Sequence, residues 1–409
     1  MTYYYPSKKV KHICLVGDAC VVTTTDSRYI LPLDVSKLLI DCLHGMSEED
    51  LYEKYHAIGP DYEPVIHQVF RSNIMSSILE SSTKYMPSNK PILYGTLGCF
   101  YPQQIIIELT NLCNLSCTHC YKNATQQNPK FQDYNNLSKL SSFIGINVPQ
   151  IVLTGGEPLL HPHINELIRL FHNKDIIVKT NGTYLNHLKP EVVNCVRLFS
   201  ISAYGLSNNE YKQRTGNGDG FSDLVAGLNY IANQSVDYEI TVTLSKNKIA
   251  QMRQYAEFAY NNGAKSLSFG IVSKEGRAQK TYSEWELSVE ELRWAYKEIR
   301  NLGEDYSGKL NILQWERPMI ERFVPKTIAI GNQSALFCGA GLFHWTVTEN
   351  FCFKPCVTMS DSEFLTLSFD TWKAYVQGKY EINWNIEINK VRDSIIRSGR
   401  SLKEVCSRL

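Results

Sequence analysis

The hydrophobic pattern divides the 409-residue chain into three parts, and the first spans residues 1–92. Two apolar, β-branched runs, HICLVGD (12–18) and CVVTTTDSRYILPL (20–33), predict two strands. Apolar residues at helical spacing then predict helices at 34–46, 47–59 and 62–79, with Ser47 as the N-cap of the second. Pro87 and Pro91 mark a linker at the end of this domain.

From residue 105 onward, short apolar runs alternate with helical stretches. The runs lie at 105–110, 150–154, 176–180, 196–202, 238–245 and 266–272. This alternation predicts an α/β fold with a parallel sheet and helices outside it. Six units are too few to close an eight-stranded barrel, so residues 100–308 are expected to form an open, partial (β/α)6 barrel. Functional residues should lie in the loops at the carboxyl ends of its strands. After residue 309 the alternation fades, and residues 309–409 are expected to be a small, loop-rich third domain.

Composition excludes several classes of partner. The formal net charge is +1, so no overall field favours nucleic acid or an anionic membrane. The first residues lack the apolar run of a signal peptide, and no apolar stretch is long enough to span a bilayer. We therefore expect a cytoplasmic protein with no nucleic-acid or membrane partner. In that compartment clustered cysteines indicate a metal or catalysis rather than disulfides.

Three cysteines gather in CNLSCTHC (113–120), three residues after the first barrel run. Structural zinc takes four ligands, commonly as two close pairs, whereas here Cys117 and Cys120 form one pair and Cys113 stands alone. His119 is expected to point to the other side of this short loop. A cubane iron–sulfur cluster accepts three thiolates and leaves one iron open to chelate a small molecule. The spacing favours such a cluster and leaves zinc as the alternative.

A second motif, LTGGEPLL (153–160), ends the second barrel run. Gly155 and Gly156 carry no side chain, so the backbone there can approach a ligand closely. Glu157 offers a carboxylate suited to an ammonium group. An ordinary turn is the alternative for this stretch.

CNLSCTHCY and TGGEP together resemble the radical S-adenosylmethionine (radical SAM) enzymes, over about residues 100 to 356. The resemblance implies that Cys113, Cys117 and Cys120 hold three irons of a [4Fe–4S] cluster whose fourth iron binds S-adenosylmethionine. One electron from the cluster would cleave the sulfonium, and the 5′-deoxyadenosyl radical would take a hydrogen from the substrate. An electron donor such as a flavodoxin or ferredoxin is implied as well. The cofactors supply the difficult chemistry, and the protein orients them.

The resemblance also suggests residues around S-adenosylmethionine, beside Gly155, Gly156 and Glu157. His119 would lie near the adenine, or would only pack the loop. Ser202 would bind the ribose, although Tyr204 stands where the family commonly has an aspartate. Arg214 would meet the methionyl carboxylate, or would be a solvated charge. KEGRA (274–278) is assigned only a turn near the site, and the catalytic residues of the substrate step are unknown.

The segment CGAGLFHWTVTENFCFKPC (338–356) resembles the start of the auxiliary-cluster domains, SPASM or twitch, of the same superfamily. It implies one auxiliary iron–sulfur cluster on Cys338, Cys352 and Cys356, with Cys99, Cys406 or substrate as a fourth ligand. The glycine usual in the hairpin turn is replaced around Asn350–Phe351, where asparagine tolerates a left-handed backbone. Zinc or buried thiols are the alternatives. The remaining cysteines are expected in the core: Cys14, Cys20, Cys42 and Cys195.

Residues 1–92 resemble the winged-helix-like peptide-recognition element of peptide-modifying enzymes, in which a leader peptide pairs with an exposed strand. A DNA-binding winged helix shares the scaffold, but the third helix holds one arginine and no lysine and so lacks a basic stripe. The three parts together resemble radical maturases of ribosomally made peptides. We expect an intrapeptide C–C or thioether cross-link as the product. A peptide epimerase and a non-catalytic iron–sulfur or zinc peptide-binding module are the alternatives.

Overall fold

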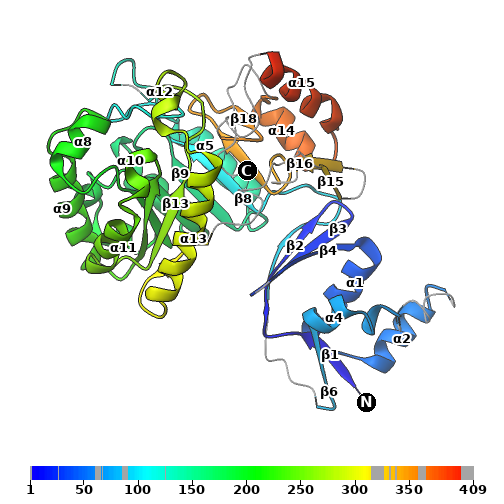
Figure 1. The fold of residues 1–409 in the computed structure, drawn as a ribbon. Helices are drawn as coiled ribbons and strands as arrows, with labels where there is room; N and C mark the ends of the chain where they lie inside the picture. The colour runs from blue at the N-terminus through cyan, green and yellow to red at the C-terminus, as the bar shows by residue number, and fades with distance from the viewer. Residues whose placement is uncertain are drawn as a thin grey trace.

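The structure is a computed structural model. It describes residues 2–25, 27–59, 66, 68–84, 91–124, 126–314, 327–330, 333–336, 339–357 and 365–397. An N-terminal unit, a partial barrel and a C-terminal segment follow one another along the chain (Figure 1). No helix in these ranges combines the length and the apolar character needed to cross a membrane.

The N-terminal unit contains two small sheets and short helices. Its strands are β1 (Tyr3–Pro6), β2 (Val10–Val16), β3 (Ala19–Thr24), β4 (Arg28–Pro32), β5 (Met46–Ser47), β6 (Leu79–Ser82) and β7 (Ile92–Gly95). Its helices are α1 (Leu33–Asp41), a 3-10 turn (Cys42–His44), α2 (Glu48–His56) and α4 (Asn73–Ile78). The sheet orders are β4-β3-β2-β7 and β5-β1-β6.

Two details of this unit differ from the sequence prediction. The second predicted strand is a hairpin, because β3 and β4 pair in antiparallel fashion around the turn near Ser27. The predicted helix at 62–79 is interrupted: Ser72 accepts a hydrogen bond from the Met75 amide at 3.2 Å and starts α4 as a new N-cap. Residues 62–65 and 67 of that helix lie outside the described residues. The predicted cap of α2 is confirmed, since Ser47 accepts from the Asp50 amide at 3.0 Å.

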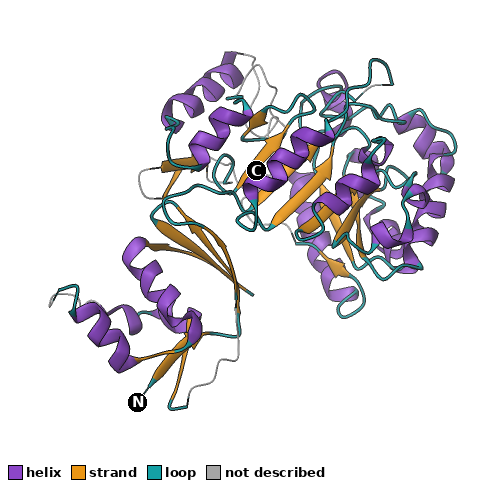
Figure 2. Cartoon of the chain, turned by 180° about the vertical axis from the view of Figure 1, so that it is seen from behind, coloured by secondary structure: helices purple, strands orange, loops and turns teal. Residues whose placement is uncertain are grey.

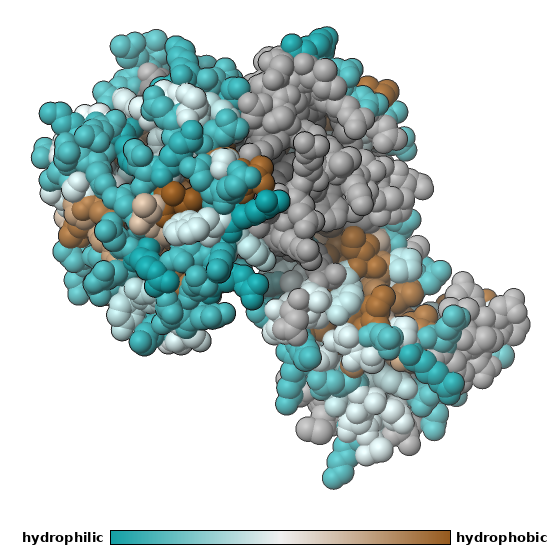
Figure 3. All heavy atoms as spheres, in the orientation of Figure 1, coloured by the Kyte–Doolittle hydropathy of each residue, from teal (hydrophilic) through white to brown (hydrophobic). Residues whose placement is uncertain are grey.

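Both faces of the four-stranded sheet are buried. Ile13 and Leu15 of β2 belong to a core with α1, whereas Cys14 and Val16 belong to a second cluster that includes Leu342 and Phe343 from the C-terminal segment. A strand buried on both faces reads as a continuous apolar run, which is why HICLV lacks alternation. The N-terminal unit is therefore packed against the rest of the protein through this face. Hydrophobic side chains of the unit gather toward that junction in Figure 3.

The barrel sheet confirms the α/β fold class. Its strands are β8 (Gln104–Glu108), β9 (Gln150–Thr154), β10 (Asp175–Thr180), β11 (Leu198–Ser202), β12 (Asp237–Thr243), β13 (Ser266–Gly270), β14 (Asn311–Ile312), β17 (His344–Val347) and β18 (Phe353–Lys354). The order is β14-β13-β12-β11-β10-β9-β8-β17-β18, and β8 to β13 run parallel. The two edge strands of this sheet, β14 and β18, do not pair with each other in the described part of the chain, so the barrel is open as predicted.

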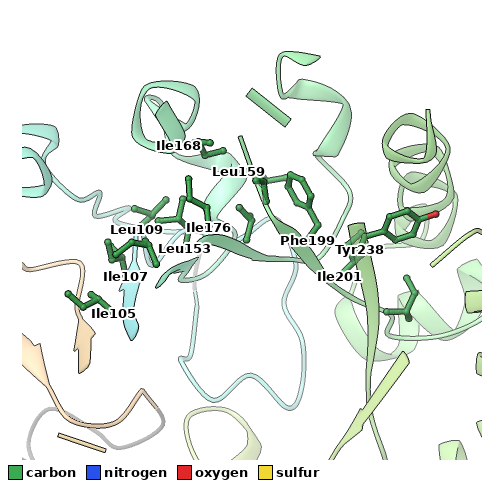
Figure 4. Packing of buried hydrophobic residues seen from close by; sticks show 14 of the residues in the cluster. Ile105, Ile107, Leu109, Leu153, Leu159, Ile168, Ile176, Phe199, Ile201 and Tyr238 are labelled. Carbon is green, nitrogen blue, oxygen red and sulfur yellow. The ribbon is translucent and has the colours of Figure 1, made fainter. Parts of the chain in front are cut away.

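Helices cover the outside of the sheet (Figure 2). They are α5 (Tyr134–Ile144), α6 (Ile164–Leu170), α7 (Pro190–Val193), α8 (Asn208–Thr215), α9 (Gly220–Ala232), α10 (Lys246–Ile249), α11 (Met252–Asn261), α12 (Ala278–Trp285) and α13 (Val289–Asp305), with 3-10 turns at Pro158–Leu160 and Leu185–His187. Ile105, Ile107 and Leu153 of the strands join one core with Ile168 of α6 (Figure 4). This core holds the strand ends, and with them the loops that carry the cysteines, in fixed positions.

The C-terminal segment is more regular than the sequence predicted. It holds β15 (Thr327–Ile330), β16 (Gln333–Leu336), α14 (Phe369–Val376) and α15 (Trp384–Arg397), and its hairpin β17–β18 continues the barrel sheet. Trp345 of β17 packs against Trp372, Tyr375 and Trp384 from the two helices. Trp345, Trp372 and Trp384 lie far apart in sequence and share no helical period, so the pattern did not reveal this cluster; only Trp372 and Tyr375 lie at helical spacing, on α14. The domain boundaries at residues 92, 100, 308 and 309 remain predictions.

The hairpin turn between β17 and β18 also differs in one residue. The left-handed position is Phe351, with φ of 59°, and not the asparagine before it. Left-handed backbone is unfavourable for a bulky residue. The Phe351 ring packs on Phe353 and Phe369 at centroid distances of 5.5 and 5.3 Å, and this packing offsets the strain.

Candidate functional site

A cavity of about 360 Å³ opens at the carboxyl ends of the parallel strands. Residues at the ends of five successive strands line it: Thr154, Thr180, Ser202, Thr243 and Gly270. Cys113, Cys117 and Cys120 line the same cavity from the loop after β8. The structure therefore brings the cysteine loop to the end of the barrel where the sequence placed the functional residues.

The three thiols fit an iron–sulfur cluster better than a single metal ion. Cys113 and Cys117 are buried, Cys120 is half-buried, and all three carry free thiols. In the described part of the chain, no three His, Cys, Asp or Glu side chains are close enough together to hold one ion. Zinc requires ligands that converge at 2.0–2.3 Å on one centre. In a cubane each thiolate binds a different iron, so wider spacing is expected.

The two glycines of the second motif allow two loops to meet. A Cβ atom on Gly155 would lie 2.5 Å from the Thr110 carbonyl oxygen, and one on Gly156 would lie 2.2 Å from that of Leu112. The Gly156 amide donates to Thr110 at 2.7 Å. The close backbone approach is therefore made to the segment leading into Cys113, and the predicted approach to a ligand stays a prediction. Both glycines also line the cavity.

Glu157 is fully buried and engaged by its own protein. Its carboxylate accepts hydrogen bonds from the Leu159 amide at 3.0 Å, the Thr180 hydroxyl at 2.7 Å and the Asn181 amide at 2.8 Å. Burial raises the pKa of Glu157 to about 7, although these three donors oppose the shift. Glu157 is not among the residues that line the cavity. These contacts tie the loop after β9 to the loop after β10, and its binding of an ammonium group stays a prediction.

His119 has the character expected of a residue near a neutral, polar ligand. It lines the cavity, and its ring lies 4.2 Å from that of Trp285. Burial, followed by the charges of Lys248, Arg214 and Arg277, lowers the pKa of His119 to about 3, so the ring is neutral. Its buried Nδ1 has no hydrogen-bond partner in the described structure. A neutral ring with an unsatisfied nitrogen suits a heterocyclic ligand.

Ser202 and Arg214 are placed differently. Ser202 lines the cavity, and its hydroxyl lies 3.3 Å from that of Thr241, so its predicted contact with a ribose stays open. Arg214 is half-buried rather than freely solvated. Its guanidinium donates to the Ser245 hydroxyl at 3.2 Å and lies 5.5 Å from the Trp285 ring centre. Arg214 does not line the cavity, and its contact with a carboxylate stays a prediction.

The structure adds three residues to the predicted site region. Lys248 is fully buried, and burial together with Arg214 lowers its pKa to about 7. Tyr204, noted only as a departure from the family, lines the cavity and is buried enough that its pKa is raised well above the usual value. Arg277 of KEGRA lines the cavity too. No local pattern marks a lysine as buried or an arginine as half-buried, so neither Lys248 nor Arg277 could be found from the sequence.

The predicted auxiliary ligands are only partly brought together. Cys352 and Cys356 lie on the β17–β18 hairpin and its exit, and the neighbouring Val357 lines the cavity. Cys338 and Cys406 lie outside the described residues. The Cys99 carbonyl accepts a hydrogen bond from Gly17 at 2.8 Å, before the start of β8. Cys99 is therefore at the opposite end of the sheet from the cysteine loop.

A model of the radical SAM superfamily matches residues 107–259, which include the cysteine loop and β8 to β12. The chain contains a radical SAM domain. Domains of this superfamily use a [4Fe–4S] cluster and S-adenosylmethionine, and the three thiols at the cavity fit that cluster.

Two curated relatives are similar to this chain. The chain is 24% identical over 271 residues to the sporulation killing factor maturation protein SkfB of Bacillus subtilis (strain 168), which covers 64% of this chain and 62% of SkfB. It is 27% identical over 206 residues to an AdoMet-dependent heme synthase of Methanosarcina barkeri, which covers 48% of this chain and 58% of that enzyme. The chain thus spans less than two thirds of the length of either relative.

The fold outside the radical SAM domain also has a solved counterpart. The crystal structure of Streptococcus suis SuiB bound to precursor peptide SuiA superposes with a TM-score of 0.62 and covers 91% of this chain and 88% of that chain. The identity is 12%, so the likeness is one of fold alone. Because it spans nine tenths of the chain, it includes much of the sequence on either side of the radical SAM domain.

Proposed function

We propose that the protein is a radical SAM maturase that installs an intrapeptide C–C or thioether cross-link in a ribosomally made precursor peptide. The observation that carries the proposal is the combination of the cysteine-lined cavity with an N-terminal unit that has an open sheet edge. The SuiB fold likeness supports it, since that structure was solved with a precursor peptide. The similarity to SkfB, a maturation protein, supports it as well.

Each part of the cavity has a proposed task. Cys113, Cys117 and Cys120 hold the cluster, Ser202 contacts the ribose, and His119 presents its unsatisfied Nδ1 to the adenine. When bound, the cluster and S-adenosylmethionine supply the radical that removes a hydrogen atom from the peptide. Gly155 and Gly156 keep the surrounding loops close enough to exclude water. A flavodoxin or ferredoxin is the proposed electron donor.

The auxiliary cluster belongs to the same proposal. Cys352 and Cys356 are its proposed ligands among the described residues. Cys338 is the third, and Cys406 or substrate is the fourth, because Cys99 lies at the opposite end of the sheet. A second cluster suits cross-linking because it can accept the second electron or bind a substrate thiol. Epimerisation instead needs a hydrogen donor at the cavity. The mass of the product separates the two outcomes, since a cross-link removes two hydrogen atoms and epimerisation removes none.

The leader of the precursor is proposed to pair with β4. Among the described strands β4 pairs only with β3, so its other side offers unpaired backbone groups. Ile30 of β4 is 43% exposed and presents an apolar side chain along this edge. Strand addition gains affinity from backbone hydrogen bonds and selectivity from alternate side chains.

The test uses the full chain, reconstituted without oxygen, and a precursor encoded beside it. Ile30→Asp should weaken precursor binding at least tenfold, because a charge replaces an apolar contact at the paired edge. Ile58→Asp is the matched control, since Ile58 is 60% exposed in the same unit but lies after α2. Both variants should still release 5′-deoxyadenosine. The proposal fails if the wild type releases none, or if Ile30→Asp modifies the precursor at the wild-type rate.

A further inference from the structure

The loop that follows Cys117 has no regular secondary structure, so beyond turn contacts such as the Cys120 amide to the Cys117 carbonyl at 3.2 Å, partners from elsewhere are needed for its carbonyl groups. Four of them are those of Cys117, Thr118, Cys120 and Ala124. One segment, residues 276–281, donates to all four. It follows the carboxyl end of β13, across the sheet from β8, and leads into α12.

Arg277 makes three of these contacts. Its Nε donates to the Cys117 carbonyl at 2.9 Å, and its Nη1 donates to the carbonyl of Ala124. Its backbone amide donates to the Cys120 carbonyl at 2.9 Å. A guanidinium has a rigid, planar set of donors, so it can hold two carbonyl groups in a fixed relative position. A lysine ammonium is a compact point charge and lacks this geometry. Arg277 therefore bridges the two ends of the segment that contains Cys120.

The neighbours of Arg277 complete the contact. Thr281 donates its hydroxyl to the Thr118 carbonyl at 3.1 Å. Gly276 has φ of +56°, and a Cβ there would lie 2.3 Å from the Tyr121 carbonyl oxygen and 2.4 Å from that of Cys120. Only glycine permits this approach without moving one backbone. The segment is thus shaped to lie against the cysteine loop.

The guanidinium also brings a positive charge to the cysteines. The charge of Arg277 acts on Cys117, and its remaining donor, Nη2, is buried with no hydrogen-bond partner in the described structure. A cluster held by three thiolates is anionic and becomes more so when it takes an electron. A fixed positive charge nearby, in a site with little water, favours the reduced form.

We propose that Arg277 is a positioning residue for the cluster, which holds the cysteine loop in its ligating shape and raises the reduction potential of the bound cluster. This inference rests on the assignment of Cys113, Cys117 and Cys120 to a cluster, and it does not depend on the peptide substrate. The loop is therefore shaped before iron arrives. The charge acts only once the cluster is present, so the two effects can be measured separately.

The experiment compares Arg277→Gln, Arg277→Lys and Thr281→Val with the wild type. Lys280→Gln is the matched control, because Lys280 is exposed and makes the same charge change on the same helix. Hydrogen exchange is measured on metal-free protein. In Arg277→Gln, the amides of residues 116–120 should exchange at least tenfold faster. Thr281→Val should accelerate the same amides to a smaller extent, and Lys280→Gln should match the wild type.

The reduction potential is measured on reconstituted protein by a titration followed by electron paramagnetic resonance. Arg277→Gln should have a more negative midpoint than the wild type. Arg277→Lys and Thr281→Val keep the charge and should stay near the wild-type value. Unchanged exchange in Arg277→Gln overturns the loop-shaping role, and an unchanged potential overturns the charge role. Failure of the wild type to bind iron would instead refute the cluster assignment, and the exchange data on metal-free protein would still stand.

Discussion

Replacing Glu157 separates a structural role from a cofactor role. The carboxylate holds two backbone amides and one hydroxyl inside the protein. Glu157→Ala leaves the amides of Leu159 and Asn181 without an acceptor, whereas the Thr180 hydroxyl can rotate toward another one. Each buried donor left unsatisfied costs about 1–3 kcal/mol. We therefore expect Glu157→Ala to lower the free energy of unfolding by about 2–6 kcal/mol from the two amides.

This loss is large beside the total stability of a domain, about 5–15 kcal/mol. For a domain the size of this barrel, each kcal/mol lowers the melting temperature by about 2–4 °C. Thermal unfolding of the metal-free protein should therefore shift by about 4–24 °C in Glu157→Ala. Glu157→Gln keeps one carbonyl oxygen and should lose about half as much stability. Glu284→Ala, an exposed glutamate on α12, is the control and should change little.

The pH dependence gives an independent check. Burial raises the pKa of Glu157 to about 7, above its value in the unfolded chain, about 4.3. The folded state then binds more protons than the unfolded state between these two values. Stability contributed by Glu157 is present below about pH 4.3 and is lost as the pH rises to about 7. The stability gap between wild type and Glu157→Gln should narrow over that range. A constant gap, or a melting temperature for Glu157→Ala within about 2 °C of wild type, would refute this reasoning.

Three further predictions concern other parts of the fold. The pKa of Lys248 is lowered to about 7, so the folded state binds fewer protons than the unfolded state between about pH 7 and 10.4. The free energy of unfolding of the wild type, measured with denaturant, should therefore rise relative to that of Lys248→Met over this range, by up to about 1.4 kcal/mol per pH unit. Parallel pH curves for the two proteins would contradict this. Phe351→Gly should be more stable than Phe351→Ala by about 1–2 kcal/mol in the same assay. Both variants lose the aromatic ring, but only glycine tolerates φ of 59°. Equal free energies of unfolding would rule out the left-handed turn. Replacing Cys113, Cys117 and Cys120 together by alanine should remove one [4Fe–4S] cluster by iron analysis and all release of 5′-deoxyadenosine; any release that persists shows that the cluster lies elsewhere.

The barrel could be predicted from the sequence because its signals are local. β8 and β9 form uninterrupted apolar runs, and the other parallel strands are short runs with β-branched residues between helical stretches, so β8 to β13 fall within a few residues of their predicted positions. The signals for the cysteines and for the glycine pair are equally local, because each motif lies in a short loop directly after a strand. In the N-terminal unit, the hairpin at Ser27 and the break before α4 depend on single serine and turn residues inside apolar runs. A turn or a new N-cap of this kind divides a strand or a helix without changing the spacing of its apolar residues.

Contacts between distant residues could not be predicted in this way. Arg277 is 160 residues from Cys117, and nothing in KEGRA shows which loop its guanidinium will meet. The aromatic cluster of Trp345, Trp372 and Trp384 likewise becomes visible only when β17 joins β8. Burial of Lys248 depends on the packing of α10 beneath Trp285 and Tyr255. These features follow from the folded barrel, not from any period in the chain.

The attachment of the C-terminal hairpin bears on how two clusters would be spaced. β17 pairs with β8 from His344 to Val347, so the hairpin is part of the sheet that carries the cysteine loop. Lys122, two residues after Cys120, forms ion pairs with Glu108 of β8 at 2.8 Å and with Glu349 of the hairpin turn at 2.7 Å. Breaking a buried pair leaves an uncompensated charge at a cost of about 3–5 kcal/mol. A cluster on Cys352 and Cys356 would therefore be held at a fixed position relative to the first by backbone pairing and a buried cation. The β17–β18 hairpin is thus an extension of the barrel sheet.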